Sequence, residues 1–172
     1  MGVTVHFEGQ LRNADAYDAV VKAATDFAAA RSWPVAHFEN DQVTLGRVRD
    51  EQDWDYEGPT RGVELQPHPS SEPIRLEFDR DLYVQEYTKT QFAPQNVHEE
   101  LIRLLDLLKP WFDAFSVTDE GEYFETRDSS LLEHHRSRCF ELMDEHLASD
   151  SSLRGPVRLP SGRIADLIRD DA

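Results

Sequence analysis

The chain opens with an alternation of apolar and polar residues and then changes to a helical spacing. Residues 3–8 (VTVHFE) alternate as a half-buried strand does. Apolar side chains then recur on one face of residues 13–31, and Asn13 or Asp15 can accept a backbone hydrogen bond as the N-cap. The opening of the chain therefore predicts a strand followed by a helix.

Several short apolar runs follow, with turn residues between them. Residues 35–39 and 43–48 flank a short polar stretch (NDQ) and predict a hairpin. Residues 62–66, 74–78 and 82–89 alternate as strands and are separated by a proline-rich turn and by the sequence DRD. This part of the chain predicts an antiparallel sheet.

Two further helices and another hairpin are expected in the second half. Residues 94–109 carry apolar residues on one face, and residues 129–147 begin with serines that can cap a helix. Between them, residues 114–117 and 122–126 surround the sequence TDEG, in which glycine permits the backbone of a tight hairpin. The sequence thus predicts a helix, a second hairpin and a third helix.

The predicted fold class is α+β, with a mainly antiparallel sheet of about seven strands and three main helices. Residues 1–148 should form this single domain, and residues 149–172, rich in Gly, Pro and Ser, should form an irregular segment. Ser161 is expected to cap a short helix within that segment. The apolar residues of this helix would be Ile164, Leu167 and Ile168.

A weak internal similarity suggests that one unit occurs twice. A gapless shift aligns residues 32–50 with residues 110–128, so that Trp33 meets Trp111 and an Arg-Asp pair ends both segments. Each segment follows a predicted helix. We therefore expect a pseudo-repeat of strand, helix and hairpin.

Composition and charge narrow the class of function. Hydrophobic residues make up 39% and charged residues 30% of the chain, which is typical of a folded globular protein. The formal net charge of −16 opposes binding to nucleic acid or to anionic membrane surfaces and favours a basic partner. Cys139 is the single cysteine, and the N-terminus shows neither a secretory signal nor a long apolar run. We expect a cytoplasmic protein without a cofactor.

From the first helix onward, the predicted order of elements is helix, antiparallel strands, helix, two strands and helix. This order, together with the acidity, is similar to that of type III secretion chaperones. The resemblance implies a small cytoplasmic protein, with a homodimer as one arrangement, that binds an unfolded segment of a partner. The leading strand and the strands between residues 62 and 88 depart from that family's plan, and fold analogy by itself does not establish function.

The stretch DEQDWDYEGPTRGVELQ, residues 50–66, matches two kinds of binding site. Its oxygen-bearing side chains have the spacing of a calcium loop, with a glycine at the sharp turn. The calcium ligands would be Asp53, Asp55, Glu57 and Glu64. Pro59 and the strand-like flanks argue against calcium. Alternatively, Trp54 and Tyr56 are aromatic anchors in an acidic rim, as expected where a basic protein docks.

The other candidate sites have incomplete motifs. Asp119, Glu120 and Glu122 lie in the second predicted hairpin and extend the acidic docking surface. His68 and His98 could act with carboxylates in a small-molecule hydrolase, but no nucleophile or phosphate-binding motif accompanies them. His135 and Cys139 share a helical face and lack further metal ligands at suitable spacing.

The function expected from the sequence is that of a non-catalytic, acidic protein-binding module, chaperone-like or toxin-neutralising, that engages a basic or partly unfolded protein. The residues expected to bind the partner are Asp53, Trp54, Asp55, Tyr56, Glu57, Asp119, Glu120 and Glu122. The hydrolase and a weak calcium-binding protein are the alternatives.

Overall fold

A computed structural model describes residues 2–170 and confirms the α+β class, with antiparallel strand pairs and four α-helices. The long strands are β1 (Thr4–Leu11), β2 (Val35–Leu45), β5 (Tyr56–Leu65), β6 (Ile74–Phe78), β7 (Tyr83–Lys89) and β8 (Phe112–Asp119). The two-residue strands are β3 (Val48–Arg49), β4 (Gln52–Asp53), β9 (Leu153–Arg154), β10 (Val157–Arg158), β11 (Ile164–Ala165) and β12 (Ile168–Arg169). The helices are α1 (Ala14–Ala29), α2 (Gln95–Leu108), α3 (Tyr123–Thr126) and α4 (Ser129–Ser149), and a 3₁₀ turn, η1, covers Lys109–Trp111.

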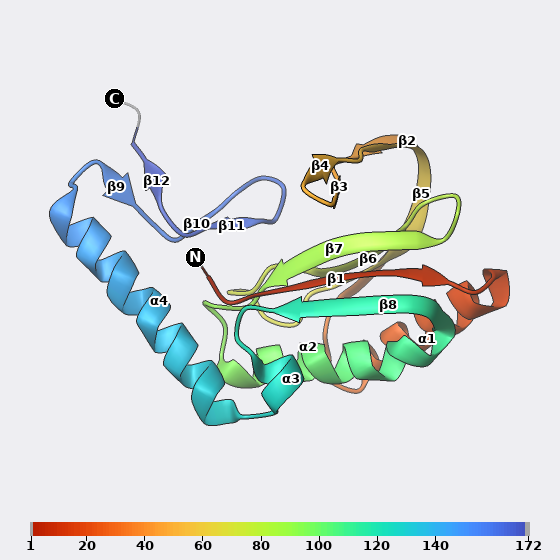
Figure 1. The fold of residues 1–172 in the computed structure, drawn as a ribbon, viewed down its shortest axis with the longest axis horizontal. Helices are drawn as coiled ribbons and strands as arrows, with labels where there is room; N and C mark the ends of the chain where they lie inside the picture. The colour runs from red at the N-terminus through yellow and green to blue at the C-terminus, as the bar shows by residue number, and fades with distance from the viewer. Residues whose placement is uncertain (1, 171–172) are drawn as a thin grey trace.

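The N-terminal strand lies at the centre of one three-stranded sheet, in the order β7-β1-β8 (Figure 1). Its register places His6 between Tyr87 and Thr118, so these three side chains share one face. A second sheet has the order β2-β5-β6. The turn from β6 to β7 joins the two sheets, and there the Asp79 amide donates to the Tyr83 carbonyl at 3.0 Å.

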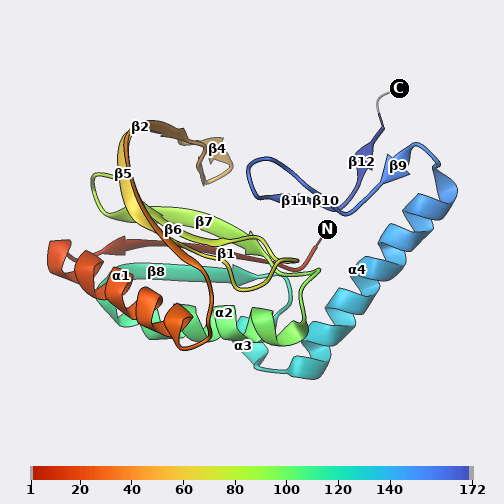
Figure 2. The ribbon, with the colours of Figure 1, turned by 180° about the vertical axis from the view of Figure 1, so that it is seen from behind.

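Helices α1 and α2 lie along one face of the sheets and bury the core (Figure 2). Asn13 caps α1 by accepting from the Ala16 amide at 2.9 Å, as its sequence position predicts. Alternation on the strands sends one set of side chains toward the helices. The largest fully buried aliphatic and aromatic residues are Phe7, Phe78, Leu65, Ile74, Leu76, Leu101, Ile102, Leu104, Leu105, Leu108 and Leu132. No helix of residues 2–170 has the length and apolar character needed to cross a bilayer.

The opposite face of the β7-β1-β8 sheet, here called the open face, carries no helix from this pair. Residues 43–57, here called the arm, rise above it as the end of β2, the β3–β4 hairpin and the start of β5 (Figure 1). Gln85 on the open face exchanges two hydrogen bonds with the backbone of Val48 on the arm, each 2.9 Å long. The arm is therefore fixed over one end of the open face.

The last helix, α4, leads to the C-terminal segment, here residues 150–170, at the other end of the open face (Figures 1 and 2). Asp128 caps α4 by accepting from the amides of Ser130 and Leu131, so the cap expected from the serines is wrong. The short strands of the segment pair only with one another within the described chain, as β9 with β12 and β10 with β11. The helix expected after Ser161 is wrong, because Ile164 and Ile168 lie in two-residue strands.

Both predicted hairpins are also wrong. Residues 35–45 form one strand with a bulge between Asn40 and Val43, because β2 pairs along the length of β5. After β8, the chain turns into the short helix α3, since the Asp119 carboxylate accepts from the amides of Gly121 and Phe124. The strand-helix-hairpin unit is consequently not repeated.

Candidate functional site

A cleft of about 580 Å³ lies on the open face between the arm and the C-terminal segment. Its floor comes from β7, β1 and β8, one wall comes from the arm, and Arg163 of the C-terminal segment lies at the other side. The residues that line it are His6, Phe7, Glu8, Thr44, Leu45, Gly46, Val48, Gln85, Glu86, Tyr87, Ser116, Thr118 and Arg163. This volume falls within the range of ligand pockets in proteins.

The Glu8 carboxylate is held in place on the cleft floor. Its Oε2 accepts from the Tyr83 hydroxyl at 2.7 Å and from the Gln85 amide at 2.6 Å. Among residues 2–170, its Oε1 has only a long contact, 3.4 Å, with the Ser116 hydroxyl. Burial alone would raise the pKa of Glu8, but these hydrogen bonds and the charge of Arg49 outweigh it and lower the pKa. The cleft therefore contains an ionised carboxylate with one oxygen free to accept another donor.

His6 and Tyr87 form the neighbouring part of the floor. Their rings lie 5.6 Å apart, and His6 Nε2 is 3.9 Å from Glu120 Oε1 at the end of β8. Burial would raise the pKa of Glu120, but the nearby His6 ring and the hydrogen bond from the Thr4 amide lower it overall. Glu120, expected from the sequence to bind a partner, thus lies exposed beside the cleft.

The predicted aromatic anchors lie on the arm and have structural contacts. Trp54 is 37% exposed, and its ring packs 5.3 Å from that of Tyr83 while Arg49 stacks over it at 3.5 Å. The Tyr56 hydroxyl donates to the Pro59 carbonyl at 2.8 Å. Both rings therefore pack within the arm, Tyr56 is half-buried, and part of Trp54 remains accessible.

The acidic residues of the arm do not form the calcium loop that their spacing suggests. Asp53, Asp55 and Glu57 are exposed along β4 and the start of β5. Glu64 lies seven residues farther along β5, about 23 Å at strand rise, where it pairs with Arg75 at 3.0 Å. A strand cannot wrap these oxygens around one ion. Within residues 2–170, no group of three or more His, Cys, Asp or Glu side chains is arranged to hold a metal ion.

Asp119, another residue expected to bind a partner, lies inside the protein. Its carboxylate accepts from His98 Nε2 at 3.0 Å, and His98 Nδ1 lies 2.8 Å from the Thr90 hydroxyl. The side chains of the His98–Asp119 pair are 1% and 0% exposed. Asp119 is therefore unavailable to a partner, whereas Glu122, expected to share its role, is exposed.

Neither histidine of the hydrolase alternative lies in a suitable site. His98 lines neither the cleft nor the second surface cavity, which His68 borders between α1 and α2. The carboxylate lining that second cavity, Glu100, is bound by Arg31 and Arg103. The pair of converging carboxylates that such an enzyme needs beside its histidine is not found at either position.

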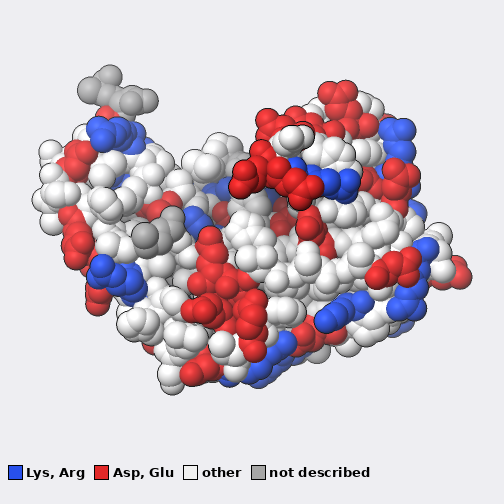
Figure 3. Space-filling model, in the orientation of Figure 1, with Lys and Arg blue, Asp and Glu red and all other residues white. Residues whose placement is uncertain are grey.

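The cleft is suited to binding a cationic group. The space-filling view shows acidic side chains on the arm and around the end of β8, with the surface hollowed between the arm and the C-terminal segment (Figure 3). The exposed acids of these two regions are Asp50, Glu51, Asp53, Asp55, Glu57, Glu120, Glu122 and Glu125. An acidic rim attracts a cation, and the Glu8 carboxylate can pair with it on the floor.

The sequence contained a signal for Glu8 and His6. In the alternating strand VTVHFE, the polar residues at 6 and 8 share one face, opposite the core face of Val5 and Phe7. Their partners on β7 and β8 could not be identified without the strand order. No family model, curated protein or solved structure shows significant similarity to this chain.

Proposed function

We propose that this protein is a non-catalytic, acidic binding module that receives a basic side chain of a protein partner in the cleft on its open face. The observation that carries the proposal is the ionised Glu8 carboxylate, held by Tyr83 and Gln85 with Oε1 directed to a weak contact only. A partner ammonium or guanidinium would supply the missing donor and form a charge-assisted hydrogen bond.

The acidic rim supports the same partner chemistry. The arm contributes exposed carboxylates beside the cleft wall, and Glu120 lies beside His6 on the floor. Charge of this kind speeds association with a basic protein and selects against anionic ligands. Trp54 adds a partly exposed ring at the arm. We expect the module to act in the cytoplasm, as the features of the sequence favour.

The test uses a labelled peptide with several arginines and a matched peptide in which neutral citrulline replaces each arginine. Fluorescence anisotropy should show binding of the arginine peptide, and Glu8→Gln should weaken it about tenfold, which corresponds to about 1.4 kcal/mol. The matched control is Asp18→Asn, which removes one negative charge from an exposed position of helix α1, on the other side of the sheet from the cleft.

Equal weakening by both substitutions would show that only the net charge of the protein attracts the peptide, and would contradict the proposal. Equal binding of the citrulline peptide would do the same. Glu8→Gln should remain folded, since the glutamine oxygen can still accept the hydrogen bonds from Tyr83 and Gln85. Circular dichroism of the variant checks this.

A further inference from the structure

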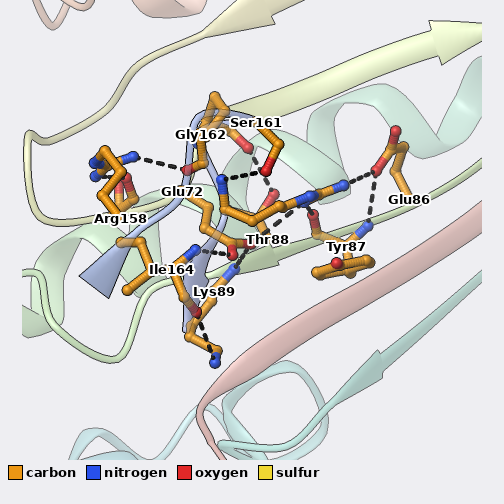
Figure 4. Close-up of polar contacts among 12 residues, drawn as sticks. Glu72, Glu86, Tyr87, Thr88, Lys89, Arg158, Ser161, Gly162 and Ile164 are labelled. Atoms are coloured by element: carbon orange, nitrogen blue, oxygen red, sulfur yellow. Dashed lines mark hydrogen bonds and ion pairs between the residues drawn. The ribbon is translucent and has the colours of Figure 1, made fainter. Parts of the chain in front are cut away.

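Arg163 of the C-terminal segment lies at one side of the cleft and contacts Glu72, Glu86 and Tyr87. Figure 4 shows these three residues beside the C-terminal segment. Arg163 Nη2 donates to Glu86 Oε2 at 2.7 Å, and its Nη1 donates to the Tyr87 carbonyl at 2.7 Å. Nη1 also lies 3.3 Å from Glu72 Oε2, and the guanidinium carbon stands 3.8 Å above the centre of the Tyr87 ring. Two carboxylates, a carbonyl and an aromatic face together bind one guanidinium.

The main body of the protein supplies every one of these groups. Glu72 is 2% exposed and Glu86 is 12% exposed. The Lys89 amide donates to Glu72 Oε2 at 3.0 Å, and the Glu72 amide donates to the Lys89 carbonyl at 2.9 Å, so β7 holds this carboxylate in position. Planar guanidinium matches such an arrangement of acceptors, whereas a lysine ammonium cannot donate in parallel and stack as well.

The two largely buried carboxylates of the pocket need a positive group to balance their charge. Burial raises the pKa of Glu86, and Arg163 opposes that rise. Without a cation, the two carboxylates would remain close together with little access to water, at a cost to the folded state. The pocket is therefore selective for a positive group.

The C-terminal segment contacts the body mainly through polar groups around this pocket. Arg158 donates to the carbonyls of Pro69 and Ser71. Lys89 donates to the Ile164 carbonyl (Figure 4) and to the Asp166 carboxylate. The Ile164 side chain is the buried apolar contact of the segment, at 7% exposure. Because its strands pair only with each other, the segment can leave without breaking a strand pair of the main sheets.

We propose that the pocket formed by Glu72, Glu86 and Tyr87 is an arginine-binding site, that Arg163 occupies it within the chain, and that an arginine of a basic partner protein displaces Arg163. This inference rests on the proposed function, since it names the partner side chain and a competitor for the same cleft. The segment then acts as an internal ligand that restricts binding to partners able to replace it.

The test uses the full-length chain with Arg163→Ala and needs no protein partner. The probe is N-acetyl-arginine amide, with N-acetyl-lysine amide for comparison, and binding is followed by NMR shifts of Tyr87. The arginine probe should bind Arg163→Ala at least about tenfold more tightly than it binds the unmodified protein, because the internal competitor is gone. The lysine probe should bind more weakly than the arginine probe. Arg154→Ala, in the same segment but paired at the surface with Asp170, should behave like the unmodified protein.

Hydrogen exchange provides a second measurement. Residues 157–165 should exchange faster in Arg163→Ala than in Arg154→Ala, with unchanged protection in β1, and Arg163→Lys should lie between them. Equal binding of the arginine probe to Arg163→Ala and to the unmodified protein would overturn the inference, as would equal exchange in the two alanine variants. If the arginine probe binds Arg163→Ala while Glu8→Gln leaves peptide binding unchanged, the arginine site stands and the proposed role of Glu8 fails.

Discussion

Replacing Arg47 with alanine should release the arm from the turn between β6 and β7 and lower the free energy of unfolding of the protein. The Arg47 side chain is 2% exposed, and its partner Asp79 is 5% exposed. Arg47 Nη1 donates to Asp79 Oδ2 at 2.6 Å, and Nη2 donates to the Tyr83 carbonyl at 3.2 Å. The rings of Trp54 and Tyr56 lie beside the guanidinium. This buried ion pair connects the arm to the turn between β6 and β7.

The expected loss in the free energy of unfolding is about 3–5 kcal/mol, because removal of one partner leaves the other charge buried without compensation. Arg49→Ala is the matched control two residues away. Arg49 is exposed and stacks on Trp54, so its loss should cost about 0.5–1 kcal/mol, the value of an exposed cation–π contact. Urea denaturation followed by far-ultraviolet circular dichroism measures both variants.

Losses for Arg47→Ala and Arg49→Ala that agree within experimental error would refute this reasoning. A double variant gives a further check on the mechanism. Arg47→Met combined with Asp79→Asn should be more stable than Arg47→Met alone, since the second change removes the charge that the first leaves unpaired. A double variant less stable than Arg47→Met would show that Asp79 acts through its bonds to nearby amides instead.

Three further predictions concern the net charge, the buried acid and the closest strand contact. With a net charge of −16, the free energy of unfolding should rise as NaCl is increased from about 0.05 to about 0.5 M, and a fall would contradict self-repulsion. Burial would raise the pKa of Asp119, but hydrogen bonds from His98 and two amides lower it overall. The ionised Asp119 therefore stabilises the folded state above the unfolded pKa of about 3.9, and this stabilisation is lost as the pH falls through the lower folded pKa. Asp119→Asn should therefore cost about 2–4 kcal/mol at neutral pH, and urea denaturation should show this gap narrowing below about pH 4; a constant gap would refute the charge argument. Gly62→Ala would place a Cβ 1.8 Å from the Leu76 carbonyl oxygen, so thermal denaturation should reveal a loss of about 1–3 kcal/mol, and an unchanged midpoint would show that β5 and β6 can separate freely.

The helices could be predicted because their signals are local. Asn13 accepts a hydrogen bond within the first turn of α1, and the apolar residues of α2 recur at helical spacing. The predicted hairpins failed because turn residues give only a preference. Pairing with β5 keeps residues 35–45 in one strand, and the buried Asp119 carboxylate favours a helical turn after β8.

The sequence likewise predicted only part of the candidate site. The sequence identified the arm as acidic and aromatic, and it predicted that Trp54 and Tyr56 bind a partner. In the structure, Trp54 packs against Arg49 and Tyr83, and the Tyr56 hydroxyl donates to the Pro59 carbonyl. Long-range contacts of this kind have no periodicity along the chain, so no local pattern could distinguish a docking ring from a packed one.

By itself, the sequence determined the α+β class, the cap of α1, the apolar faces of the helices and the net negative charge, because these depend on neighbouring residues or on composition. The tertiary structure alone decided that Glu8 of β1, Gln85 of β7 and Ser116 of β8 meet on one floor, and that Arg163 lies against Glu72 and Glu86. The physical reason is strand order: residues far apart along the chain become neighbours only when the sheet assembles, and their charges and hydrogen bonds then act on one another.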